Sequence, residues 1–175
     1  MDKIFTPIHF TWLANRKCSF NCPSCNLTKN CEDDLPQNIL YSVMDKVKEK
    51  FPSIVFWCVL GGDVLDLPKP VEFVKELSDR KVFYAITSHS KFPYKSMPED
   101  MMKAGLTNWS VSIDQESRPK TKYGFKAIDI FKELGQKDIH ATLTIDRTNI
   151  NNILELIEKL DSLDVWSEVT PYIWS

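Results

Sequence analysis

The chain has 175 residues, of which 43% are hydrophobic and 26% are charged, and its formal net charge is -2 at pH 7. This is the composition of an ordinary globular protein, and the absence of a long basic run argues against a general nucleic-acid surface or a polybasic membrane anchor. No window is apolar and long enough to cross a bilayer, and residues 1–7 lack the apolar stretch of a secretion signal, so we expect a cytoplasmic protein.

Strand-like apolar runs alternate with amphipathic helical patterns along the whole chain. In the first predicted helix, for example, Ile39, Val43, Val47 and Phe51 recur at the four-residue spacing of one helix face. In chain order, the pattern predicts a strand over residues 4–13, a helix over 36–51, a strand over 53–60, a helix over 70–79, a strand over 81–88, a helix that Ser96 opens in a capping box and Gly105 ends, a strand over 107–114, a helix over 126–134, a strand over 138–146, a helix over 149–163 and a strand over 165–174.

This alternation predicts an α/β fold built from βαβ units around a sheet of six parallel strands. Six units are fewer than the eight of a closed (β/α)8 barrel, so the sheet is either an open partial barrel or a flat doubly wound sheet. Periodicity alone does not separate these two architectures. The chain has no Gly-, Ser- or Pro-rich linker and no internal repeat, so we expect a single domain over residues 1–175. In either architecture, ligands bind at the carboxyl ends of the strands.

Three cysteines follow the first predicted strand with the spacing C-x-x-x-C-x-x-C: Cys18, Cys22 and Cys25. Clustered cysteines in a reducing compartment indicate a metal or redox site more than a disulfide framework. Three thiolates can hold three irons of a 4Fe–4S cluster and leave the fourth iron open to a substrate or cosubstrate. Cys58 lies inside an apolar strand, and we expect it in the core.

Three other interpretations of these cysteines stay open, and the simplest is a chance placement of buried cysteines without a metal. Cys31 can act as a fourth ligand, which would make a closed structural zinc or iron–sulfur site in a non-catalytic metal-binding module. Cys22 and Cys25 alone form a C-x-x-C pair, which is also typical of dithiol redox centres. Replacement of Cys31 by alanine separates the open three-cysteine cluster from the closed four-cysteine site, because only the closed site needs that residue.

Polar residues also follow the second, third and fourth predicted strands. Gly61-Gly62-Asp63 comes directly after the second strand, where adjacent glycines allow close backbone approach and the carboxylate suits an ammonium group. Ser88 and His89 end the third strand; a histidine there is either a site residue or a solvated loop residue. On the fourth strand, alternation points Ser110, Ser112 and Asp114 to one face, where they are either ligand-binding or structural.

The segment from Thr11 to Asn26 resembles the cluster-binding segment of the radical S-adenosylmethionine (SAM) superfamily, and Gly61-Gly62-Asp63 resembles the superfamily's GGE-type motif. One departure is Ser24, at a position that is often aromatic in that family. The resemblance implies a partial (β/α)6 barrel and a 4Fe–4S cluster on Cys18, Cys22 and Cys25. It also implies reductive cleavage of SAM to methionine and a 5′-deoxyadenosyl radical, which abstracts hydrogen from a substrate that the sequence does not name.

The resemblance further implies which residues bind the SAM cofactor. The GGE-type motif binds the SAM amino group, and a basic residue after the fourth strand pairs with the SAM carboxylate. The candidate residues are Gly61, Gly62, Asp63, Ser88, Ser112, Asp114, Lys120 and Lys122, the last two placed in a loop over residues 115–125 that also holds Arg118 and Gly124.

Partners are implied by the resemblance as well. A flavodoxin or ferredoxin is the expected electron donor. No cysteine follows Cys58, so we expect no auxiliary iron–sulfur domain. The chain stops after the sixth predicted strand, and we expect either a small-molecule substrate or a macromolecular partner that closes the open side of the barrel.

Overall fold

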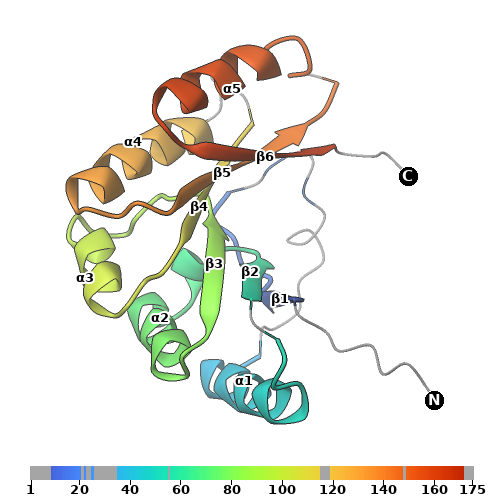
Figure 1. Cartoon of the computed structure of the whole chain (residues 1–175), viewed down its shortest axis with the longest axis vertical. Coiled ribbons are helices and arrows are strands. Elements are labelled where there is room, and N and C mark those ends of the chain that lie inside the picture. The colour runs from blue at the N-terminus through green and yellow to red at the C-terminus, as the bar shows by residue number, and fades with distance from the viewer. Residues whose placement is uncertain are drawn as a thin grey trace.

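The structure, a computed structural model, describes residues 9–20, 22, 25, 35–54, 56–114, 119–147 and 149–171. Within these ranges, six strands form one sheet in the order β1-β2-β3-β4-β5-β6, and every neighbouring pair is parallel (Figure 1). The strands are β1 (His9–Asn15), β2 (Phe56–Gly61), β3 (Phe83–Ser88), β4 (Trp109–Ile113), β5 (Ile139–Ile145) and β6 (Trp166–Pro171). The predicted α/β class and parallel six-stranded sheet are confirmed.

Helices follow the strands in turn and lie along the outer side of the curved sheet (Figure 1). In the described ranges these are α1 (Gln37–Lys50), α2 (Pro70–Asp79), α3 (Met97–Lys103), α4 (Pro119–Glu133), α5 (Ile153–Ser162) and a short 3-10 helix, η1 (Val64–Asp66). None of the helices within these ranges is long and apolar enough to span a membrane. Strands β1 and β6 stand at opposite ends of the sheet order, so the sheet is open.

The apolar core lies between the helices and the outer face of the sheet. Side chains alternate along each strand, so Trp57 and Val59 of β2 are buried beneath the helices while Cys58 and Leu60 face the inner side. The largest fully buried side chains include Trp57, Trp109, Tyr84, Phe73 and Phe131. Full burial of an apolar side chain of this kind contributes roughly 1.5–3 kcal/mol. The core therefore fixes the strands from outside and leaves the inner face for a site.

The structure corrects the sequence analysis at the start of α4. This helix begins at Pro119 rather than residue 126, so Lys120, Lys122 and Gly124 are helical and not in a loop. Apolar periodicity missed the first two turns because their buried face carries Lys120, Thr121 and Gly124. A Cβ on Gly124 would lie 2.9 Å from Ile113 Cγ1, so this glycine lets the helix pack closely on β4.

Three smaller expectations also change. Helix α5 begins at Ile153 rather than residue 149, because Asn149 uses its side chain to bind the backbone of neighbouring segments. Ser96 precedes α3 as predicted, but its side chain makes no capping hydrogen bond to the helix. Cys58 is half-buried on the inner face of the sheet, not in the apolar core. The ends of the first and last predicted strands, residues 4–8 and 172–174, lie outside the described residues.

Candidate functional site

A cavity of about 450 Å³ lies at the carboxyl edge of the sheet. Its volume is in the usual range of roughly 300–1,000 Å³ for small-molecule sites. Residues from the ends of β2 to β6 meet there with residues of the segment that follows β1. The lining residues are Cys18, Phe20, Cys22, Cys25, Leu60, Gly61, Gly62, Asp63, Thr87, Ser88, His89, Ser112, Lys120, Thr144 and Thr170. Most of the predicted site residues are therefore brought to one cavity.

All three cysteines of the predicted cluster motif line this cavity. Cys18, Cys22 and Cys25 are half-buried free thiols. The Cys25 amide donates a hydrogen bond to the Cys22 carbonyl over 3.0 Å. Cys31, the proposed fourth ligand of a closed site, lies outside the described residues. Three thiols that converge on one cavity suit an iron–sulfur cluster, whose irons are held by cysteine thiolates.

The Cys18 thiol lies in an environment that favours its protonated form. Its pKa is raised to about 12, mainly by burial; the nearby carboxylates of Asp63 and Asp66 act in the same direction, and a hydrogen bond from the Phe20 amide acts in the opposite one. Cysteine binds metals as the thiolate. A metal bound at Cys18 would therefore displace a proton, and its charge would take the place of that proton beside the two carboxylates.

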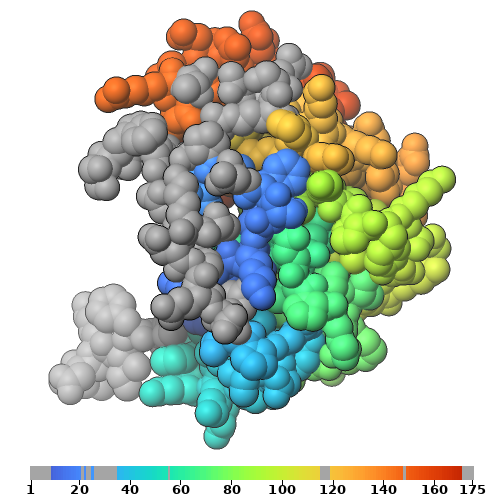
Figure 2. Space-filling view, turned by 180° about the vertical axis from the view of Figure 1, so that it is seen from behind, coloured from blue at the N-terminus to red at the C-terminus, as the bar shows by residue number. Residues whose placement is uncertain are grey.

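The segment that carries Cys18 is fixed by backbone contacts to the loop after β2. The Gly62 amide donates to the Asn15 carbonyl over 2.7 Å, and the Asp63 amide donates to the Lys17 carbonyl over 2.8 Å. The Asn15 side-chain amide donates to the Lys17 and Asp63 carbonyls. In the space-filling view, the blue amino-terminal segment accordingly lies against green residues from later in the chain (Figure 2).

Gly62 is where these two segments approach most closely. A Cβ at this position would lie 1.9 Å from the Lys17 carbonyl oxygen, and the nearest atoms are all backbone. We expect Gly62→Ala to displace the cysteine segment and to lower the free energy of unfolding by about 1–3 kcal/mol, as overpacking usually does. Urea denaturation and the iron retained after anaerobic reconstitution measure both effects.

Gly135→Ala is the matched control for Gly62→Ala. Gly135 has a positive φ of 82°, but a Cβ there would have no atom within 4 Å. This variant should lose some stability from backbone strain and retain its iron. Wild-type stability and iron content in Gly62→Ala would contradict the close approach.

The Asp63 carboxylate is buried and accepts hydrogen bonds from three protein groups. Its Oδ1 accepts from the Leu65 amide over 2.9 Å and from the Ser88 hydroxyl over 2.8 Å, and its Oδ2 accepts from the His89 amide over 2.6 Å. Burial raises the pKa of the Asp63 carboxyl, while His89 and these donors act in the opposite direction. Asp63 thus joins η1 to the end of β3, and both of its oxygens are already engaged by the protein.

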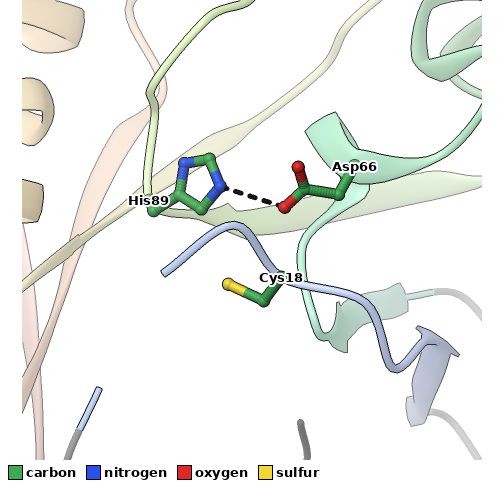
Figure 3. A group of neighbouring side chains, drawn as sticks. All are labelled: Cys18, Asp66 and His89. Carbon is green, nitrogen blue, oxygen red and sulfur yellow. Dashed lines mark hydrogen bonds and ion pairs between the residues drawn. The ribbon is translucent and has the colours of Figure 1, made fainter. Parts of the chain in front are cut away.

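His89 lies beside Asp66 and Cys18 (Figure 3). It is buried, so the solvated-loop interpretation of this residue is wrong. One ligand atom from each of Cys18, Asp66 and His89 lies within 4.8 Å of the others. Phe20 packs on the imidazole with ring centroids 4.6 Å apart. The cysteine segment, the loop after β2 and the end of β3 therefore meet at His89.

Lys120 also lines the cavity, and its ammonium group forms an ion pair with Asp114. Lys120 Nζ lies 2.9 Å from Asp114 Oδ2, and the two residues are 7% and 0% exposed. Ser112 of β4 lines the cavity, whereas Lys122 is exposed on α4 and is not among the lining residues. Of the two predicted basic candidates, Lys120 is thus the one at the cavity. Arg118 lies outside the described residues.

Sequence reasoning missed two residues that organise this region. Asp66 accepts from the Ser19 amide over 2.7 Å, next to Cys18 in the chain. Asn149 donates to the Asp114 carbonyl over 2.5 Å and accepts from the Asp146 amide over 2.8 Å. Both stand within a few residues of a strand end, and a search for carboxylate and amide side chains at those positions would have found them.

The chain was compared with known proteins. No protein-family model and no curated protein matches it. Among solved structures, Streptococcus suis SuiB bound to S-adenosylmethionine matches with a TM-score of 0.80 and 16% identity, over 97% of this chain and 41% of SuiB. SuiB bound to the precursor peptide SuiA matches with a TM-score of 0.79 and 17% identity, over 95% of this chain and 40% of that one. BtrN in complex with AdoMet and 2-DOIA matches with a TM-score of 0.61 and 15% identity, over 86% of this chain and 60% of BtrN.

These comparisons decide between the two architectures that the sequence left open. The fold is an open α/β sheet similar to the partial barrel of radical SAM enzymes. At 15–17% identity the likeness concerns the fold alone. This chain spans 41% of SuiB, so it corresponds to less than half of that protein's length.

Proposed function

We propose that this chain is a radical SAM enzyme, with a 4Fe–4S cluster held by Cys18, Cys22 and Cys25. The observation that carries the proposal is the convergence of these three thiols on one cavity at the carboxyl edge of a partial-barrel sheet. The donor set fits, because three thiolates bind three irons and leave one iron open. When bound, the cluster supplies the electron for reductive cleavage of SAM, which gives methionine and the 5′-deoxyadenosyl radical.

The chain's own residues divide between binding and positioning in this proposal. Gly61, Gly62, Ser88, Ser112 and Lys120 line the cavity and are the proposed SAM contacts. The Lys120 ammonium is suited to a carboxylate, and we assign it to the SAM carboxylate.

Two of the predicted SAM contacts take positioning roles instead. Asp114 holds the Lys120 ammonium, and Asp63 joins the segments around the cavity through its hydrogen bonds. Lys122 is left out of the proposed site because it is exposed and does not line the cavity.

The electron donor and the substrate are proposed only as classes. A flavodoxin or ferredoxin fits the need for one-electron reduction of the cluster. For the substrate, the sheet is open between β1 and β6, which leaves room for a small molecule or for a macromolecule that closes this side. SuiB, one of the proteins with a similar fold, has been solved with a precursor peptide, so peptides belong in the first substrate screen.

Anaerobic reconstitution with iron and sulfide, followed by EPR of the reduced protein with and without SAM, tests the proposed function. We expect a 4Fe–4S spectrum that changes when SAM is added, because SAM would bind the open iron. The variant with alanine at Cys18, Cys22 and Cys25 should bind no cluster. Cys31→Ala should behave as the wild-type protein does.

Two outcomes would contradict the proposal. Loss of the metal in Cys31→Ala would indicate a closed four-cysteine site and the non-catalytic binding module. A cluster spectrum that SAM leaves unchanged would remove the open iron on which the enzymatic function depends.

A further inference from the structure

His89 links three segments around the proposed cluster site. Its Nδ1 accepts a hydrogen bond from the Lys91 amide over 3.0 Å, so the proton of the neutral ring is on Nε2. Nε2 lies 3.1 Å from Ser19 Oγ, 3.3 Å from Asp66 Oδ2 and 3.6 Å from Asp63 Oδ2. The structure therefore determines the tautomer and directs its single N–H toward these oxygens.

The neighbours of His89 are joined to Cys18 by short connections. Ser19 follows Cys18 in the chain, and its amide donates to the same Asp66 oxygen that lies near His89 Nε2. Phe20, which packs on the imidazole, donates its amide to Cys18 Sγ over 3.5 Å. Ser19 therefore contacts both His89 and Asp66. Phe20 contacts both His89 and Cys18.

The local charge explains why a hydrogen-bond donor is needed here. Asp63 Oδ2 and Asp66 Oδ2 lie 3.6 Å and 3.3 Å from His89 Nε2, and Asp66 and His89 each place a ligand atom within 4.8 Å of that of Cys18. Without the His89 side chain, the two carboxylates would face the metal-binding segment with one N–H donor fewer. Burial makes this loss costly, because His89 is only 3% exposed and water cannot easily replace the imidazole.

We propose that His89 is a positioning residue that orients Cys18 for metal binding through Ser19, Phe20 and Asp66. This inference rests on the proposed function, because it assumes that Cys18 holds the cluster. His89 contacts Ser19, Phe20 and Asp66, which surround the proposed metal ligand Cys18. Partners of this kind orient metal ligands, and their loss typically costs about 10- to 100-fold in metal affinity or activity.

The test compares His89→Leu, His89→Gln and His140→Leu with the wild-type protein. Leucine removes the N–H donor, whereas the glutamine side-chain amide restores a donor near the position of Nε2. His140 is the matched control: it is half-buried on β5, contacts Asn108 and Trp166, and does not line the cavity. Each protein is reconstituted anaerobically and challenged with an iron chelator, and the g-values of the reduced cluster and the melting temperature of the metal-free protein are recorded.

We expect His89→Leu to retain iron about 10- to 100-fold less tightly and to show altered g-values. His89→Gln should recover most of the affinity and the wild-type spectrum, and His140→Leu should match wild type in both. Wild-type affinity and spectrum in His89→Leu would overturn the inference. So would a His89→Gln variant that melts as wild type but binds iron as poorly as His89→Leu. A wild-type protein that forms no cluster would overturn the proposed function itself, before any variant is compared.

Discussion

Replacing Lys120 with methionine is expected to lower the free energy of unfolding by about 3–5 kcal/mol, because it removes the ammonium group that pairs with the buried Asp114 carboxylate. The two residues form an ion pair of 2.9 Å, and Asp114 is 0% exposed. The Asp114 backbone is also tied to Asn149 and Thr121, so the carboxylate cannot easily swing into water. Urea denaturation of the metal-free protein measures the loss.

Two further variants show whether the ion pair is the cause. Lys122→Met changes an exposed lysine on the same helix and should alter stability by less than about 0.5 kcal/mol. The double variant Lys120→Met/Asp114→Asn should regain most of the loss, because it removes the buried charge as well. Unchanged stability in Lys120→Met would contradict a structural role for the pair. If Lys120→Met then bound SAM more weakly than Lys122→Met does, the result would assign Lys120 to SAM binding alone.

Replacing Asp63 with alanine is expected to lower the free energy of unfolding by at least about 3 kcal/mol, because three buried donors lose their acceptor at roughly 1–3 kcal/mol each. These donors are the Leu65 amide, the Ser88 hydroxyl and the His89 amide. Asp63→Asn should cost less, because one oxygen remains for Leu65 and Ser88 while the new amide nitrogen faces the His89 amide. Chemical denaturation of the metal-free proteins gives both values.

The control for Asp63 is Asp79→Ala, which removes an exposed carboxylate paired with Lys75 on α2. An exposed pair contributes at most about 1 kcal/mol. The sequence resemblance assigns Asp63 to the SAM amino group, which predicts weaker SAM binding in a protein of normal stability. That result would contradict the structural role argued here and would support direct contact with the cofactor.

Much of the fold follows from local patterns in the sequence. The nearly continuous apolar run over residues 53–60 and the four-residue spacing in α1 are local patterns, and β2 and α1 form close to where these patterns predict them. The predicted start of α4 was wrong because the buried face of the first turns carries Lys120, Thr121 and Gly124. These residues are buried by an ion pair and by close helix–sheet packing, which are tertiary effects that periodicity does not contain.

The candidate site divides in the same way. Cys18, Cys22 and Cys25 were found because their spacing is local, and Gly61 and Gly62 because they follow a strand end. The roles of Asp66 and His89 depend on contacts with Ser19 over 47 and 70 positions of sequence. Single-sequence reasoning placed His89 at a strand end, but it could not tell a solvated residue from one buried between two carboxylates.

The long separation between the cysteine segment and its anchors also bears on how the site is completed during synthesis. Chains emerge amino terminus first, so Cys18 and Ser19 leave the ribosome well before Asp66 and His89, which lie 47 and 70 positions after Ser19. A nascent chain that ends before β2 has the three thiols but neither Asp66 nor His89, and one that ends before β3 still lacks His89. Stable loading of the proposed cluster therefore waits for the first three strands to assemble, and cluster delivery is a late step relative to translation of the motif.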